Sequence, residues 1–126
     1  YRPQQVMAHK LKKHDDELTL QLQRSPDILA AVAALPDAPF TLGFAAETEN
    51  LEVNARAKLV NKRLDMLAAN PVGQPGVGFD SHNNALRVFW RDGALDLGQD
   101  SKTRLAERLI ELVADTMAAS AENKPE

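Results

Sequence analysis

Three lysines near the start of the chain, Lys10, Lys12 and Lys13, have the charge and the spacing to bind phosphate groups. Residues 3–16 around them show little apolar periodicity, which predicts a mobile flap rather than a helix or a strand. Ammonium groups on such a flap can reach over a polyphosphate and neutralise the charge that develops in a transition state. The alternative is a solvated surface that binds no ligand.

A second pair of lysines, Lys58 and Lys62, lies four residues apart in the chain, which predicts that both side chains share one helix face. Close to a strand end, two such ammonium groups could hold the phosphates or the base of a nucleotide. Solvation alone also explains the pair, so the spacing leaves both interpretations open.

The segment Ser25-Pro26-Asp27 predicts the start of a helix. Ser25 can cap it, Pro26 suits the first helical position, and the helix dipole favours the negative charge of Asp27. The functional alternative is that backbone amides here hold an anion while Asp27 holds a divalent cation shared with phosphates. Phe44 likewise has two interpretations, as a core residue or as a platform on which a base packs.

Composition excludes several classes of protein. The net charge of −3 argues against a general nucleic-acid binder, and no apolar run approaches the length of a membrane span. The absence of cysteine excludes disulfides and thiolate chemistry and is compatible with a reducing cytoplasm. The histidines lack ligand spacing, so we expect no structural zinc, and neither a phosphate-binding Walker loop nor a Ser-His-Asp order is present. The histidines are His9, His14 and His82.

The elements that must position these residues alternate along the chain. Apolar and polar residues alternate over 18–23 as in a half-buried strand, and a continuous apolar run over 40–46 indicates a strand covered on both faces. A helix follows over 51–64 and a short strand over 65–69. With the helix that starts at Ser25, residues 17–72 therefore form a predicted βαβαβ unit with a parallel sheet, in which ligands gather at the carboxyl ends of the strands.

The remaining chain predicts a loop over 73–83, a hairpin over 84–97 and a helix over 101–119. Asp92-Gly93 suits the hairpin turn, and Ser101 can cap the last helix. We expect residues 1–126 to form a single domain. The start at Tyr1, without an initiator methionine, a signal peptide or a preceding strand, favours a piece cut from a longer α/β protein.

In their order along the chain, these residues resemble phosphopantothenoylcysteine synthetase, the synthetase part of a bifunctional flavoprotein of coenzyme A biosynthesis. The resemblance covers nearly the whole chain and looks closest to the bacterial form. It rests chiefly on Lys10-Leu11-Lys12-Lys13, Ser25-Pro26-Asp27-Ile28-Leu29, Gly43-Phe44-Ala45-Ala46-Glu47-Thr48, Ala55-Arg56-Ala57-Lys58 and Asn83-Asn84-Ala85.

The resemblance implies an α/β, Rossmann-like fold with a partial parallel sheet, flanking helices and a C-terminal hairpin and helix. It also implies a ligase that joins 4′-phosphopantothenate to cysteine through an acyl-cytidylate formed from CTP with Mg²⁺. Lys10 would be the essential flap lysine, and Asp27 the metal or triphosphate contact. The implied CTP site comprises Lys10, Pro26, Asp27, Ile28, Leu29, Phe44, Lys58 and Lys62.

The chain departs from the family at its front, where the Gly-rich first half of the synthetase and the FMN-binding decarboxylase domain are missing. We therefore expect this piece to be inactive alone. The resemblance implies a cytoplasmic homodimer, which the fused decarboxylase would join into a higher oligomer. We expect the strand 18–23 and the hairpin to form the dimer contacts.

Two competing functions differ in class from the ligase. One is a non-catalytic dimerisation or scaffold module of a larger nucleotide-binding protein, in which the basic flap is only a solvated loop. The other is half of a dinucleotide-binding oxidoreductase, which the βαβ pattern alone supports. The chain lacks G-x-G-x-x-G, so the oxidoreductase ranks low.

Overall fold

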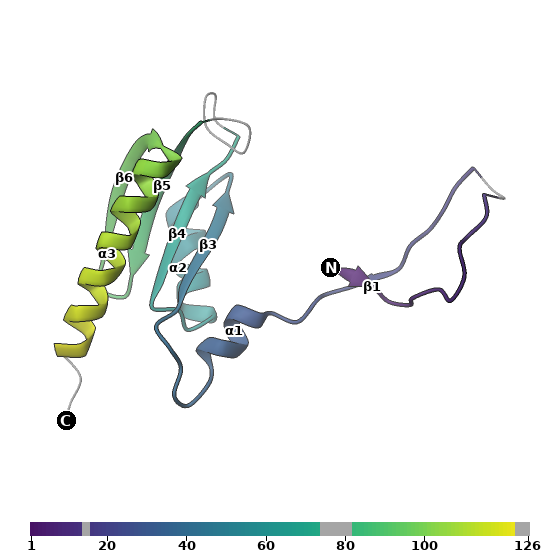
Figure 1. Ribbon diagram of the computed structural model, residues 1–126, viewed down its shortest axis with the longest axis horizontal. Coiled ribbons are helices and arrows are strands. Elements are labelled where there is room, and N and C mark those ends of the chain that lie inside the picture. The colour runs from purple at the N-terminus through teal and green to yellow at the C-terminus, as the bar shows by residue number, and fades with distance from the viewer. Residues whose placement is uncertain (14–15, 74–81, 123–126) are drawn as a thin grey trace.

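A four-stranded mixed sheet with helices on both faces forms the body of the protein (Figure 1). The computed structural model describes residues 1–13, 16–73 and 82–122. Helices α1 and α2 pack on one face of the sheet and α3 packs on the other (Figure 1). The elements are β1 (Arg2–Pro3), β2 (Leu22–Gln23), α1 (Ile28–Ala33), β3 (Leu42–Glu47), α2 (Leu51–Asn61), β4 (Met66–Pro71), β5 (Asn83–Trp90), β6 (Gly93–Ser101) and α3 (Lys102–Glu122).

The strand order β3-β4-β5-β6 combines one parallel pair with two antiparallel pairs. β3 and β4 run parallel, joined by α2, whereas β5 and β6 form a hairpin that continues the sheet antiparallel to β4. The α/β fold expected from the sequence is therefore confirmed, with a mixed sheet in place of a longer parallel one. The β3-α2-β4 unit is the part that matches the predicted βαβ pattern.

The strand predicted over 18–23 is wrong as a member of this sheet. Only Leu22–Gln23 is a strand, and it pairs antiparallel with β1. The two form a separate ribbon in an N-terminal arm that extends away from the body (Figure 1). Leu18 and Leu20, which the alternation placed on a buried face, are 70% and 64% exposed. Alternation marks a strand with one apolar face, but it does not say which surface covers that face.

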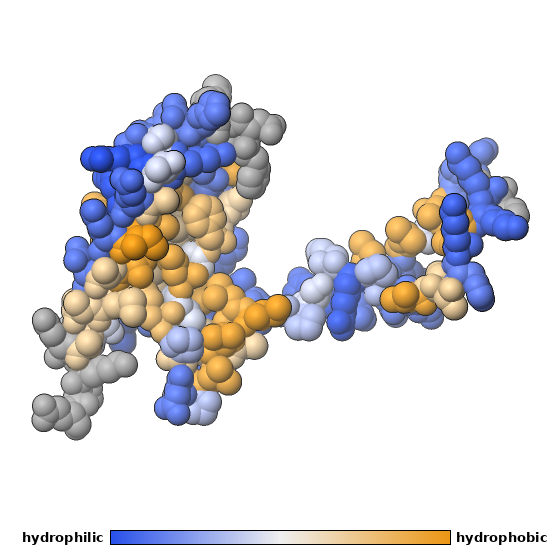
Figure 2. Space-filling model, in the orientation of Figure 1, coloured by the Kyte–Doolittle hydropathy of each residue, from blue (hydrophilic) through white to orange (hydrophobic). Residues whose placement is uncertain are grey.

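Apolar side chains recur along this arm, as Figure 2 shows for one side of the molecule. Six apolar side chains of the arm are each more than half exposed in the described chain. They are Val6, Met7, Leu11, Leu18, Leu20 and Leu22.

Helix α1 starts later than predicted, and its cap is Asp27 rather than Ser25. Asp27 has an extended backbone, and its Oδ1 accepts a hydrogen bond from the amide of Ala30 at 3.0 Å. A cap at Ser25 would also be compatible with Pro26 at the first helical position, so the proline does not decide between the two residues. The hydrogen bond from the Ala30 amide identifies Asp27 as the cap. Asp27 then takes the capping position that its short carboxylate suits.

Strand β3 is covered on both faces only at its start, where Leu42 packs against the apolar cluster beneath α3. From Phe44 onward it is covered on one face, so the prediction of a strand buried on both faces is wrong for most of its length. Gly43, Ala45 and Glu47 point toward α1 and α2, whereas Phe44 is 60% exposed on the other face. β3 is the edge strand of the described sheet, and α3 packs over the strands beyond it. Phe44 is consequently not a core residue in this chain.

The close approach of α1 to β3 depends on Gly43. A Cβ atom there would lie 2.7 Å from Leu64 Cδ1 and 2.9 Å from Leu67 Cδ1, with Leu29 of α1 at 3.1 Å. The first two contacts are closer than carbon atoms tolerate and the third is tight, so the absent side chain leaves room for three leucines. The start of α1, and with it Asp27, is held against the sheet by this packing.

Two apolar clusters, one on each face of the sheet, form the core. β4 is central to both, with Met66 and Ala68 facing α3 and Leu67 and Ala69 facing α2. All four side chains are buried. The short apolar segment that the sequence placed at 65–69 is thus an inner strand of the sheet.

The hairpin predicted over 84–97 runs from Asn83 to Ser101 in the structure. Its two-residue turn is Arg91-Asp92, one residue before the predicted Asp92-Gly93. Ser101 caps α3, because its Oγ accepts from the amide of Arg104 at 3.2 Å, and the helix continues to Glu122. Of the loop predicted over 73–83, residues 74–81 lie outside the described part. None of the described helices is long and apolar enough to cross a membrane.

Candidate functional site

Four charged side chains form a row along the β3 edge of the body, and we call it the acid–lysine row. Oδ2 of Asp27 lies 3.0 Å from Nζ of Lys62, and Oε1 of Glu47 lies 2.5 Å from Nζ of Lys58. The two lysines are neighbours on α2, four residues apart. The structure therefore brings together three of the residues predicted from the sequence, Asp27, Lys58 and Lys62, and adds Glu47.

Three separate elements position the row. Glu47 ends β3, the lysines occupy the later turns of α2 and its cap, and Asp27 caps α1. The side chains of Lys58, Lys62 and Asp27 are between 36% and 45% exposed, whereas that of Glu47 is 9% exposed. Both ammonium groups are thus open to solvent on one side, where an anion can approach them.

The pKa of the Asp27 carboxyl lies below its usual value. The main cause is the hydrogen bond from the Ala30 amide, followed by the hydrogen bond and charge of Lys62. Both interactions favour the ionised form. Asp27 is therefore a fixed negative charge that offsets Lys62.

Because the folded-state pKa of Asp27 is lowered, its ionised form stabilises the fold at pH values above the usual aspartate pKa. This stabilisation is lost as the pH falls through the lowered folded-state value. Carbon-13 NMR titration of the carboxyl should show this low value. Lys62→Met should raise the pKa only partway, because the stronger bond from Ala30 remains. A titration of Asp27 at the usual aspartate pKa would contradict this geometry.

The other predicted site residues lie apart from the row or beside it. Pro26 and Ile28 flank Asp27, and Ile28 is 76% exposed, whereas Leu29 packs into the core on the α2 side. Phe44 lies on the opposite face of the sheet, because neighbouring strand residues point to opposite faces. Lys10 belongs to the N-terminal arm, which Figure 1 shows extending away from α1, α2 and the sheet. This chain therefore does not bring Lys10 to the acid–lysine row.

Glu47 has no assigned role in the sequence analysis, although it stands in the Gly43–Thr48 motif. The signal that could have revealed it is the two-residue period of the strand. Gly43 and Ala45 precede Glu47 at that period, which places its carboxylate on the buried face. An acid in such a position needs a partner, and Lys58 supplies it.

The metal role of Asp27 stays a prediction. Both of its carboxylate oxygens already have partners, Ala30 and Lys62. Among the described residues, no group of three or more acidic or histidine side chains could hold a metal ion. The described residues therefore do not form a protein-only magnesium site.

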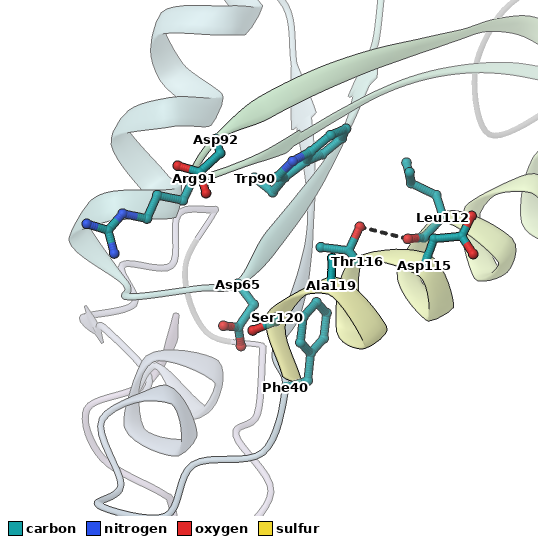
Figure 3. A pocket seen from close by; sticks show the side chains of 10 residues that line it. All are labelled: Phe40, Asp65, Trp90, Arg91, Asp92, Leu112, Asp115, Thr116, Ala119 and Ser120. Carbon is teal, nitrogen blue, oxygen red and sulfur yellow. Dashed lines mark hydrogen bonds between the residues drawn. The ribbon is translucent and has the colours of Figure 1, made fainter. Parts of the chain in front are cut away.

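A hollow of about 630 Å³ lies at the opposite end of the sheet from Glu47, between the hairpin turn and the last turns of α3 (Figure 3). Phe40 and Trp90 contribute aromatic walls, and Thr116 bonds back to the Leu112 carbonyl at 2.8 Å. Asp65 at its edge accepts from the Thr41 amide at 2.8 Å and thereby links the starts of β3 and β4. None of the residues that the sequence singled out for CTP lines this hollow.

Fold and charge together define an α/β domain with ionic groups along the edge of its parallel strand pair. The chain belongs to the family described as the DNA/pantothenate metabolism flavoprotein C-terminal domain, whose model matches residues 1–117. The family expected from the sequence is thereby confirmed.

Curated relatives and solved structures agree with this assignment. The chain is 48% identical over 120 residues to the coenzyme A biosynthesis bifunctional protein CoaBC of Vibrio cholerae, covering 93% of this chain and 30% of that protein. It is 47% identical over 115 residues to CoaBC of Escherichia coli K12, covering 88% and 28% respectively. The chain thus spans about a third or less of these relatives.

A crystal structure of the C-terminal domain of CoaBC aligns with a TM-score of 0.64 and 27% identity, covering 81% of this chain and 46% of that chain. The DNA/pantothenate metabolism flavoprotein of Streptococcus pneumoniae aligns with a TM-score of 0.63 at 21% identity, which supports the fold alone. It covers 81% of this chain and 46% of that structure.

Proposed function

We propose that the full-length protein containing this chain is a phosphopantothenate–cysteine ligase of coenzyme A biosynthesis. The names of the curated relatives support the pathway, and the resemblance of the motifs supports the reaction. A carboxylate oxygen of 4′-phosphopantothenate attacks the α-phosphorus of CTP, and pyrophosphate leaves. The amine of cysteine then attacks the acyl carbon of the cytidylate, the bond to CMP breaks, and the amine releases a proton as the amide forms.

The acid–lysine row is the observation that supports a nucleotide site most strongly. The first step brings a carboxylate toward a triphosphate, so positive charge must offset two anions. Lys58 and Lys62 supply two adjacent ammonium groups, each oriented by one carboxylate and each still partly exposed. In the proposed site they hold the phosphates of CTP.

The other parts of the site follow from the same proposal. The segment Pro26–Leu29 forms the nucleotide loop, beside the row. The base of CTP packs on Phe44, whose ring is exposed on the face of β3 opposite to Glu47. A nucleotide can contact both Phe44 and the row only by crossing the β3 edge of the sheet. Lys10 reaches the site by movement of the arm or from a second copy of the chain.

Magnesium enters this proposal with the nucleotide. Mg²⁺ in nucleotide-dependent enzymes is commonly held by substrate phosphates and one or two carboxylates. Asp27 is the one carboxylate in the proposed set, and Lys62 would have to release it for metal binding. When bound, the ion would neutralise triphosphate charge.

The proposed assembly is a cytoplasmic homodimer, enlarged through a fused FMN-binding decarboxylase. The exposed leucines of the arm support a protein contact, since several exposed apolar side chains in one segment often mark an interaction surface. The same observation favours the second candidate function, a non-catalytic dimerisation or scaffold module. The two candidates differ in whether the body binds a nucleotide.

Thermal unfolding of the full-length protein with CTP and Mg²⁺ distinguishes the two candidates. A ligand at 100 times its Kd stabilises the folded state by about 2.7 kcal/mol, so the ligase should show a clear rise in Tm. Lys58→Ala should reduce that rise, whereas Lys102→Ala, at the start of α3, serves as the control. A rise in Tm that Lys58→Ala leaves unchanged, or no rise with CTP at all, would favour the scaffold.

A further inference from the structure

Glu47 is the one buried carboxylate among the described residues, and it ends the strand β3. An ionised carboxylate in that environment is costly unless a cation or several hydrogen bonds compensate it. The described structure supplies Nζ of Lys58 at 2.5 Å. The ion pair thus accounts for the presence of a buried acid at this point of the fold.

The two partners differ in how firmly they are held. The backbone of Glu47 lies in register with Pro71 of β4, and its carbonyl accepts from the amide of Val72 at 3.0 Å. Its side chain is 9% exposed, whereas that of Lys58 is 41% exposed. A free lysine side chain samples many rotamers, and ordering it carries an entropy cost. The fixed carboxylate restricts this freedom before any ligand arrives.

We propose that Glu47 is a positioning residue that holds the ammonium group of Lys58 at the carboxyl end of β3, ready to contact a phosphate. The inference rests on the proposed function, because it takes the ligand to be the triphosphate of CTP. Glu47 itself does not contact the nucleotide. Its effect is on the affinity for CTP and passes entirely through Lys58.

A second physical effect has the opposite sign, which makes the proposal testable. A carboxylate beside the phosphate site repels the phosphates, so its removal would tighten binding if repulsion were dominant. Positioning predicts weaker CTP binding in Glu47→Gln, and repulsion predicts tighter binding. Glu49→Gln, two residues along the chain, removes the same charge from an exposed side chain and is the matched control.

The experiment measures kcat and the KM for CTP in the full-length protein carrying Glu47→Gln, Glu49→Gln, Lys58→Ala or Glu47→Gln with Lys58→Ala. We expect Glu47→Gln to raise the KM for CTP about 10-fold, a coupling of the size found for contacting charged pairs, while kcat and the KM for cysteine stay near wild type. Glu49→Gln should match the wild type. In the Lys58→Ala background, Glu47→Gln should have no further effect.

Several results would overturn the positioning role while leaving the ligase intact. These are a wild-type KM for CTP in Glu47→Gln, a lower KM, or an undiminished effect of Glu47→Gln when Lys58 is already alanine. If Glu47→Gln does not fold, Glu47→Asp replaces it in the same cycle, because a shorter carboxylate keeps the charge and alters only its reach. Failure of the wild-type protein to form the amide would instead remove the proposed function and this inference together.

Discussion

Lys10→Gln in the full-length protein is expected to lower kcat for amide formation by about 10²–10³-fold, the loss typical when one group that stabilises a transition state is removed. The first step places negative charge on phosphate oxygens as pyrophosphate leaves. A flap ammonium that approaches only at that stage stabilises the transition state more than bound CTP, so the KM for CTP should change little. Steady-state kinetics of product formation measures both constants.

Lys13→Gln is the matched control for this prediction. It removes the same charge from the same exposed segment and leaves the proposed contact in place. A loss as large as that of Lys10→Gln would indicate general electrostatic attraction by the arm. Near-normal turnover in Lys10→Gln would identify Lys10 as a solvated surface residue.

Phe89→Ala is expected to destabilise the fold by about 3–5 kcal/mol, the range for removing a large buried aromatic side chain. Phe89 is fully buried in the cluster between the sheet and α2. The guanidinium groups of Arg56 and Arg87 lie 5.3 and 5.4 Å from its ring centroid. Removing the ring therefore leaves a cavity and also takes away the surface on which two arginines rest. Urea unfolding of the 126-residue chain measures the change.

Phe44→Ala makes the same chemical change at an exposed position and should alter the free energy of unfolding by about 0.5 kcal/mol or less. The same variant should raise the KM for CTP if the base packs on this ring. Equal destabilisation by both substitutions would contradict the core described here.

The sequence patterns predicted the centre of the body well. A continuous apolar run, a helix with lysines on one face and a second short apolar run correspond to β3, α2 and β4. These elements contact one another directly along the chain, so local periodicity is sufficient to predict them. The Asp-Gly pair located the hairpin within one residue for the same reason.

Features that depend on distant surfaces could not be read from local patterns. The alternation over residues 18–23 requires an apolar partner, and it does not identify that partner as β1 rather than β3. The exposure of Phe44 depends on where α3 packs on the sheet, and α3 begins more than 50 residues later in the chain. The pairing of Glu47 with Lys58 likewise depends on the crossing of α2 over β3.

We propose above all that the full-length protein joins 4′-phosphopantothenate to cysteine at the expense of CTP. The most direct test incubates it with both substrates, CTP and Mg²⁺, and measures the amide, CMP and pyrophosphate in one reaction. We expect equal amounts of all three products, and CMP formation that requires 4′-phosphopantothenate. Absence of the amide, or amide formation without consumption of CTP, would contradict the proposal.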